Sequence, residues 1–221
     1  MNPDEAKAMI LDIGQRMYSK EWVASNDGNI SVKLDADRVL VTPTRQSKGY
    51  MTAGMLSIVD RQGHVLEGTY QPTSELKMHL KIYEMRPDVN AVVHAHPPFA
   101  TSFAVAGIPL DRYILAEAVF ELGKVPIAPY ATPSTDELTD SFVGLLSEHD
   151  CFLLKNHGAT TMGIDLMTAY YKMESLEHLA KIMNYASSLG KMDEIPQDKV
   201  RVLEGMRQKY GIHGRQPKST V

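Results

Sequence analysis

The sequence has little cysteine. Cys151 is the only one among 221 residues, so no disulfide can form within the chain, and a lone thiol is typical of proteins from reducing compartments. The chain also lacks a basic and apolar N-terminal segment of the signal-peptide type, and it has no uncharged apolar run of about 18 residues, which a membrane-spanning helix needs. We therefore expect a cytoplasmic protein that is not embedded in a membrane.

Basic charge is scarce as well. Asp and Glu (27) outnumber Lys and Arg (23), which gives a net charge of −4 with histidine neutral. This balance argues against nucleic-acid binding, which needs a basic field, but a few local donors can still hold a small anion. Apolar content is 43%, ordinary for a globular protein. Connections are short and no linker or repeat is visible, so we expect one domain over residues 1–221, with a flexible tail beyond about residue 211.

Periodicity and turn residues predict an α/β chain. Alternating or continuous apolar runs predict short strands at 30–34, 39–41, 56–60, 64–67, 91–96, 125–128 and 151–154. Capping residues and helical spacing predict helices at 2–20, 73–85, 98–106, 114–122, 134–146, from 165 onward, and 197–210.

The chain is organised around the strand that ends in His94-Ala95-His96-Pro97. Alternate side chains of a strand share a face, so His94 and His96 point the same way. Pro97 cannot continue the strand ladder. Two imidazoles at a strand end are a ready pair of metal ligands, although two ordinary polar histidines would give the same pattern.

Two further ligands can join this pair. His157 follows a buried strand within Asn156-His157-Gly158, and Glu75 falls in the first turn of a helix. A first-turn glutamate usually only compensates the helix dipole, but here it can also reach a metal. Three neutral nitrogens with an open or exchangeable position form a catalytic zinc pattern, and the wide sequence separation favours a catalytic site over a zinc finger.

Two polar loops, residues 25–29 and 42–49, flank short strands. If they lie side by side, they combine backbone amides and hydroxyls with the cations Arg45 and Lys48. Donors of these kinds together can bind an anion. Two solvated surface turns would have the same composition.

The sequence resembles the class II aldolase/adducin superfamily, most closely the L-fuculose-1-phosphate aldolase group, from the first helix to about Tyr210. The resemblance rests on a set of motifs in this order: Gly28-Asn29-Ile30-Ser31, Thr42-Pro43-Thr44, Thr73-Ser74-Glu75, His94-Ala95-His96-Pro97, Pro129-Tyr130-Ala131-Thr132 and Asn156-His157-Gly158. It implies a three-layer α/β/α sandwich with a mostly antiparallel central sheet. It also implies a four-fold symmetric homotetramer with active sites at subunit interfaces.

The resemblance further implies a role for each matching residue. Zinc would be held by His94, His96 and His157, with Glu75 as a fourth ligand that becomes the catalytic acid/base when substrate binds. Tyr113 would reach into the neighbouring subunit's site and handle the proton at the aldehyde oxygen, and Tyr210 would help to close that site. The positions that would bind the substrate phosphate are Asn29, Thr44, Thr73 and Ser74.

The implied reaction is the zinc-dependent retro-aldol cleavage of a ketose 1-phosphate, L-fuculose 1-phosphate first among them, in carbohydrate metabolism and fucose degradation. The products would be dihydroxyacetone phosphate and a small aldehyde such as L-lactaldehyde. Two departures fall in the presumed phosphate pocket: Arg45 stands where the family usually has glycine, and Asn26 where small residues are usual. Arg45 could grip the phosphate or reshape the pocket for another substrate.

Other reactions on the same scaffold stay open. These are a sugar-phosphate epimerase, a keto-acid phosphate decarboxylase and a methylthioribulose-phosphate dehydratase. The epimerase is disfavoured because such enzymes carry Asp where this chain has Glu75. A non-catalytic, adducin-like interaction module would lack the complete metal set. Among the other histidines, His79 stands out because it lies one helical turn after Glu75.

Overall fold

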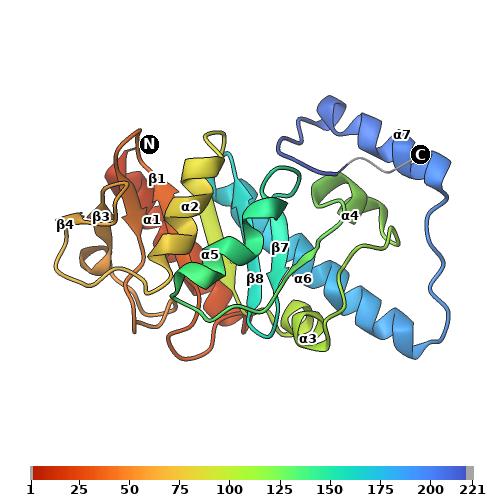
Figure 1. Cartoon of the computed structure of the whole chain (residues 1–221), viewed down its shortest axis with the longest axis horizontal. Helices are drawn as coiled ribbons and strands as arrows, with labels where there is room; N and C mark the ends of the chain where they lie inside the picture. Colours follow the sequence, from red (N-terminus) through yellow and green to blue (C-terminus); the bar gives the residue numbers. More distant parts are fainter. Residues whose placement is uncertain (1, 218–221) are drawn as a thin grey trace.

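A single eight-stranded sheet forms the centre of the computed structural model, which describes residues 2–217 (Figure 1). Its strand order is β4-β3-β2-β1-β5-β8-β7-β6, and every neighbouring pair is antiparallel except β6 and β7. The strands are β1 (Asn29–Lys33), β2 (Val39–Val41), β3 (Ser57–Val59), β4 (Val65–Glu67), β5 (Ala91–Ala95), β6 (Ile127–Ala128), β7 (Cys151–Leu154) and β8 (Gly158–Gly163). The predicted mostly antiparallel sheet is confirmed.

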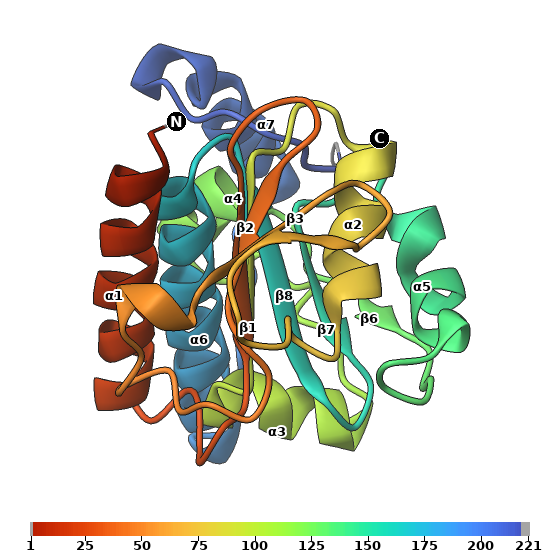
Figure 2. The ribbon, with the colours of Figure 1, turned by 90° about the vertical axis from the view of Figure 1, so that its left-hand side faces the viewer.

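Helices cover both faces of the sheet. Figure 2 shows α1 (Pro3–Ser19) and α6 (Leu166–Ser188) on one side, and α2 (Leu76–Met85) and α5 (Asp136–Phe142) on the other. Each face has its own apolar core, because alternate strand residues point in opposite directions: Val93 of β5 lies in the core under α1 and α6, and Val92 in the core under α2. The predicted three-layer α/β/α architecture is therefore confirmed.

The two long helices begin where the sequence predicts. The Asn2 side chain accepts a hydrogen bond from the Asp4 amide, and Pro3 occupies the first helical position of α1. Asp165 caps α6 by accepting a hydrogen bond from the Thr168 amide. The predicted capping box at 134–137 is wrong: Thr135 makes no capping bond at the start of α5, and Glu137 accepts from the Thr132 amide instead.

The remaining helices lie at the end of the molecule away from α1. They are α3 (Pro98–Ala106), α4 (Ala116–Glu121) and α7 (Gln197–Met206), and α7 packs on α4 (Figure 1). After α7 the chain returns to the body, where the Arg215 amide donates to Asp150 and Gln216 donates to the Val119 carbonyl. The flexible tail predicted beyond residue 211 includes residues 218–221, which lie outside the described residues.

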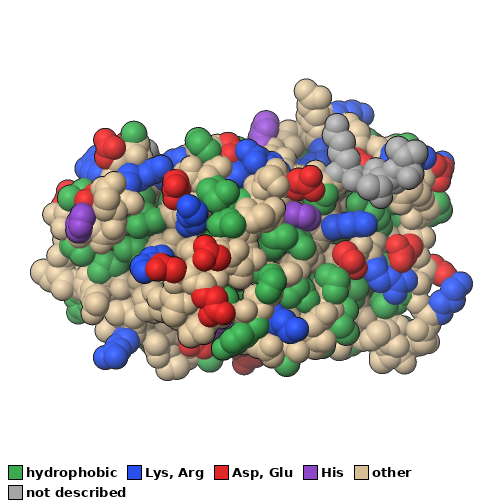
Figure 3. Space-filling view, in the orientation of Figure 1, with side chains coloured by type: hydrophobic (Ala, Val, Ile, Leu, Met, Phe, Trp, Pro, Cys, Tyr) green, Lys and Arg blue, Asp and Glu red, His purple; other side chains and the backbone are tan. Residues whose placement is uncertain are grey.

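None of the described helices is long and apolar enough to cross a membrane. On the face shown in Figure 3, basic and acidic side chains are interspersed.

Candidate metal centre and active site

Three neighbouring strands bring the predicted histidines together. His94 is on β5, between Asn29 of β1 and Thr160 of β8 in the ladder. His96 follows the same strand on the same face, and the ring centroids of His94 and His96 are 5.0 Å apart. His157 comes from the turn between β7 and β8, with its ring centroid 4.7 Å from that of His94.

The β7–β8 turn that carries His157 depends on two local features. Asn156 has a φ of 56°, and asparagine tolerates this left-handed region better than most residues. At Gly158 an added Cβ would lie 2.5 Å from the Ala95 carbonyl oxygen and 2.6 Å from His96 Cδ2. Only glycine lets the hairpin approach β5 closely enough to place its histidine beside the pair.

The histidine nitrogens converge with the Glu75 carboxylate. One nitrogen from each of the three histidines lies within 4.8 Å of the other two, and the Nε2 atoms of His94 and His96 are 3.1 Å apart. Glu75 Oε2 lies 3.2 Å from His94 Nε2, and Oε1 lies 3.4 Å from His157 Nε2. The predicted set of three nitrogens and one carboxylate therefore forms a single cluster.

The surroundings keep these imidazoles neutral and oriented. His94 Nδ1 lies 3.0 Å from the Ala159 carbonyl, which can only accept, so Nδ1 carries the proton and Nε2 offers a lone pair to the cluster. Burial lowers the pKa of all three imidazoles. The neighbouring histidines lower the pKa of His94 and of His157 further, and the pKa of His157 falls to about 4. Neutral imidazole is the metal-binding form.

Glu75 completes the donor set. It lies at the start of α2, where its exposure is 7%, and burial raises its pKa while the hydrogen bond from Asn29 opposes that rise. Among the described residues, its Oε1 atom has no hydrogen-bond partner. Three neutral nitrogens and an unsatisfied buried carboxylate oxygen fit a divalent cation, and this ligand chemistry suits zinc.

A polar pocket of about 180 Å³ opens over this cluster. It contains both predicted loops, which confirms that they lie side by side, together with the start of α2. Every residue that the sequence assigned to phosphate or substrate binding lines it: Asn26, Asn29, Thr44, Arg45, Thr73 and Ser74.

Three other residues also line the pocket: Lys48, which the sequence offered as an anion-binding cation, and Asp27 and Ser134, to which it assigned no role. Lys48 is 2% exposed, and burial lowers its pKa to about 8 against an opposing effect of Asp27. Its amine donates to the carbonyls of Asn26 and Gln46, which leaves one N–H for a ligand. Asp27 lies 3.4 Å from His96 Nδ1, and Ser134 enters from the loop before α5. For Asp27 and Ser134 the only sequence signal was their position beside the family motifs.

The two predicted tyrosines do not line the pocket of this chain. Tyr113 packs with Val119 and Val200 between α4 and α7, and burial together with the Glu204 carboxylate raises its pKa to about 12. Tyr210 is 58% exposed beside Phe120. Their assignment to a neighbouring subunit's site stays a prediction.

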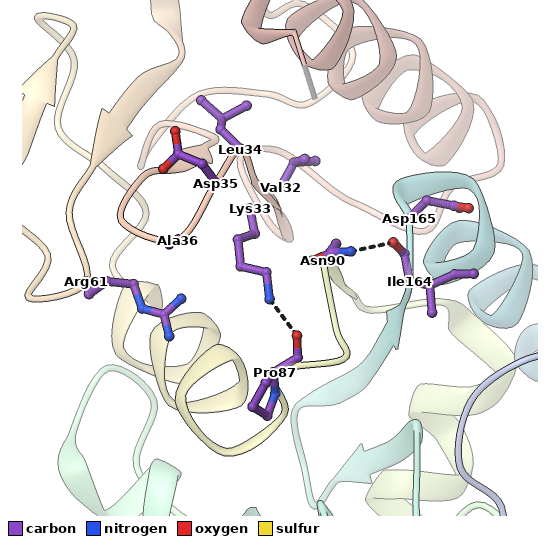
Figure 4. Close-up of a pocket in the computed structure, with 10 residues that line it drawn as sticks. All are labelled: Val32, Lys33, Leu34, Asp35, Ala36, Arg61, Pro87, Asn90, Ile164 and Asp165. Carbon is purple, nitrogen blue, oxygen red and sulfur yellow. Dashed lines mark hydrogen bonds between the residues drawn. The ribbon is translucent and has the colours of Figure 1, made fainter.

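A larger cavity, of about 510 Å³, lies at the opposite end of the central strands (Figure 4). Its polar contacts are internal, since Lys33 donates to the Pro87 carbonyl and Asn90 to the Ile164 carbonyl. None of the histidines lines it, so the chemistry belongs to the smaller pocket.

Comparison with known families decides what kind of protein carries this cluster. The family described as the class II aldolase and adducin N-terminal domain matches residues 8–184. The chain belongs to this family. It is accordingly an enzyme of the metal-dependent class II aldolase type, a carbon–carbon lyase, and the predicted relationship is confirmed.

Individual relatives of this class II aldolase differ in their reactions. It is 38% identical to an L-fuculose phosphate aldolase of Methanococcus vannielii, over 82% of this chain and 97% of that protein. It is 32% identical to a 3-oxo-tetronate 4-phosphate decarboxylase of Haemophilus influenzae, over 80% of this chain and 85% of that protein. A solved L-fuculose 1-phosphate aldolase superposes with a TM-score of 0.86 at 27% identity, covering 94% and 97% of the two chains.

Proposed function

We propose that this chain is a zinc-dependent aldolase that cleaves a ketose 1-phosphate, with L-fuculose 1-phosphate as the first candidate, into dihydroxyacetone phosphate and a small aldehyde such as L-lactaldehyde. The observation that carries the proposal is the convergence of three neutral imidazoles and the buried Glu75 carboxylate at a small polar pocket. The similarity to an L-fuculose phosphate aldolase supports the choice of substrate.

His94, His96 and His157 would hold the zinc ion through their converging nitrogens. A bound zinc ion would supply Lewis-acid stabilisation of the negative charge that develops on the substrate oxygens during cleavage. The protein's own task is to hold the substrate over this cluster and to move protons.

Glu75 is the proposed acid/base. Burial raises the pKa of its carboxyl above the usual value, and a raised pKa favours a carboxyl that takes and returns a proton, as a general acid/base must. Its Oε1 atom, without a hydrogen bond from the described residues, is the oxygen free to exchange that proton with the reacting carbon. Tyr113 of a neighbouring subunit would exchange the proton of the departing aldehyde oxygen.

Substrate binding falls to the polar rim. Asn29, Thr44, Thr73 and Ser74 would donate to the phosphate, joined by Asn26 and Arg45. The pocket of one chain is smaller than the roughly 300–1,000 Å³ of most small-molecule sites, and neither tyrosine lines it. Both observations support a site that is completed in a homotetramer, with Tyr210 of another subunit closing it. We also propose a cytoplasmic location for the protein.

A second candidate is decarboxylation of a phosphorylated keto-acid, which one relative's name describes. It is favoured by two cations, Arg45 and Lys48, that line one small pocket. A single phosphate needs one good cationic partner. A substrate that carries both a phosphate and a carboxylate would instead provide one anionic group for each of the two cations.

Product analysis separates the two candidates. Zinc-loaded protein is offered L-fuculose 1-phosphate, with dihydroxyacetone phosphate followed by a coupled assay, and separately a keto-acid phosphate, with carbon dioxide release measured. We expect rapid release of dihydroxyacetone phosphate, and loss of most of that rate in Glu75→Gln. Carbon dioxide release from the keto-acid phosphate, with no dihydroxyacetone phosphate formed from L-fuculose 1-phosphate, would replace the aldolase proposal by the second candidate.

A further inference from the structure

A buried chain of hydrogen bonds runs under α2 to the proposed acid/base. The Tyr83 hydroxyl lies 2.7 Å from Ser31 Oγ, which lies 2.6 Å from His79 Nδ1. His79 Nε2 lies 2.5 Å from Asn29 Oδ1, and Asn29 Nδ2 donates to Glu75 Oε2 at 2.8 Å. All five residues are between 0% and 7% exposed, so water cannot replace a missing partner.

The chemistry of the groups fixes the direction of every bond in this chain. An ionised Glu75 only accepts, so Asn29 must present its amide nitrogen to it and its oxygen to His79. His79 must then donate from Nε2 and accept at Nδ1, which makes Ser31 the donor to His79. Ser31 in turn accepts from Tyr83. Burial lowers the pKa of His79 to about 3 and raises that of Tyr83, so both stay neutral around pH 7.

We propose that His79 is a positioning residue for the reaction: as the Nε2–H tautomer it locks the Asn29 amide, which in turn holds Glu75 Oε2 and leaves Oε1 free for proton exchange. The inference rests on the proposed role of Glu75. It also gives Asn29 a task besides phosphate binding, since one N–H of its amide is committed to the carboxylate and the other remains for a ligand.

Without His79 the same side chains lose their orientation. The Asn29 amide could rotate and set its oxygen against the Glu75 carboxylate, where two acceptors repel each other. Outer partners of this kind typically change activity by about 10–100-fold when removed. The effect should fall mainly on kcat, because Asn29 is the only member of the substrate-binding rim that changes orientation, while Thr44, Thr73 and Ser74 stay in place.

The kinetic test compares three variants in the cleavage assay. His79→Leu removes both polar contacts, and we expect kcat to fall about 10–100-fold with a much smaller change in KM and an unchanged zinc content. His79→Gln keeps an amide N–H near the position of Nε2–H and should recover part of the loss. Thr161→Val is the matched control: it removes a buried hydrogen bond to the Ala169 carbonyl on the other face of the sheet, and it should lower stability but not kcat.

Several kinetic results would overturn the proposal. Wild-type kcat in His79→Leu would do so. So would equal losses in His79→Leu and His79→Gln, or loss of zinc in parallel with activity, which would mean that His79 supports the metal site and not Glu75. Thermal unfolding of each variant checks that the folded protein was assayed.

A second measurement is independent of substrate and of turnover. In protein labelled with 15N-histidine, long-range 1H–15N correlations at pH 7 distinguish the imidazole tautomers. We expect His79 as the neutral Nε2–H form; an Nδ1–H form or an imidazolium would refute the chain's direction. If the zinc-loaded wild type cleaved no sugar phosphate, the proposed function would fail, and this spectrum would still decide on the hydrogen-bond chain.

Discussion

Replacing Asp150 by asparagine should be among the most destabilising single changes in this chain. Its carboxylate accepts from Arg86 at 2.6 Å, from Lys172 at 2.7 Å and from the Arg215 amide at 2.9 Å. The side chains of Arg86 and Lys172 are 1% and 2% exposed. Arg86 keeps Asp88 as a second partner at 2.7 Å, but among the described residues Lys172 keeps only the Met162 carbonyl as a hydrogen-bond acceptor. Asp150→Asn therefore leaves a buried ammonium without a counter-charge.

Removal of one partner from a buried ion pair costs roughly 3–5 kcal/mol. For a chain of this size, 1 kcal/mol lowers Tm by about 2–4 °C, so thermal unfolding should show a decrease of roughly 6–20 °C. The double variant Asp150→Asn/Lys172→Met removes the orphaned charge and should recover much of the loss, whereas Asp193→Asn, in the exposed pair with Lys191, should leave Tm unchanged. If Asp150→Asn behaved like Asp193→Asn, or if the double variant were no more stable than Asp150→Asn, the reasoning would be refuted.

Three further predictions concern the active-site region. Burial lowers the pKa of His79 from 6.5 to about 3, so the unfolded chain binds its proton more tightly than the folded chain does. The contribution of this residue to stability is fully present above pH 6.5 and should fall by about 2 kcal/mol at pH 5. In urea unfolding, His79→Gln should therefore lose about 2 kcal/mol less than the wild type between pH 7 and pH 5, and equal losses would contradict the buried neutral imidazole. Gly158→Ala puts a Cβ against the β5 backbone and should weaken zinc binding about 10-fold or more in chelator competition; unchanged affinity would mean that the hairpin has room. Arg45 has a φ of 56°, a backbone conformation that glycine adopts more easily, so Arg45→Gly should leave the free energy of unfolding unchanged or raise it by roughly 1 kcal/mol. The KM for a phosphorylated substrate should rise in this variant, and an unchanged KM would exclude the guanidinium from substrate binding.

The metal cluster is the part of the site that local sequence rules describe best. Strand alternation places His94 and His96 on one face, and a polar turn after a buried strand places His157 near them. The link between Asn29 and Glu75 escaped prediction because it joins residues 46 apart in sequence, whose contact depends on how α2 packs on β1. The same holds for Asp150, whose side-chain partners come from three separate segments. The proposed place of Tyr113 in a neighbouring subunit's active site would depend on how two subunits pack, which no property of a single chain determines.

The most direct test of the account is a zinc titration of metal-stripped protein, with dihydroxyacetone phosphate release from L-fuculose 1-phosphate as the signal. The account predicts no turnover without metal and a linear rise to a plateau at one zinc ion per chain. Glu75→Gln should remain almost inactive in the presence of excess zinc, and His157→Ala should lose the stoichiometric plateau. Full activity of the stripped protein, or wild-type turnover by zinc-loaded Glu75→Gln, would contradict the account.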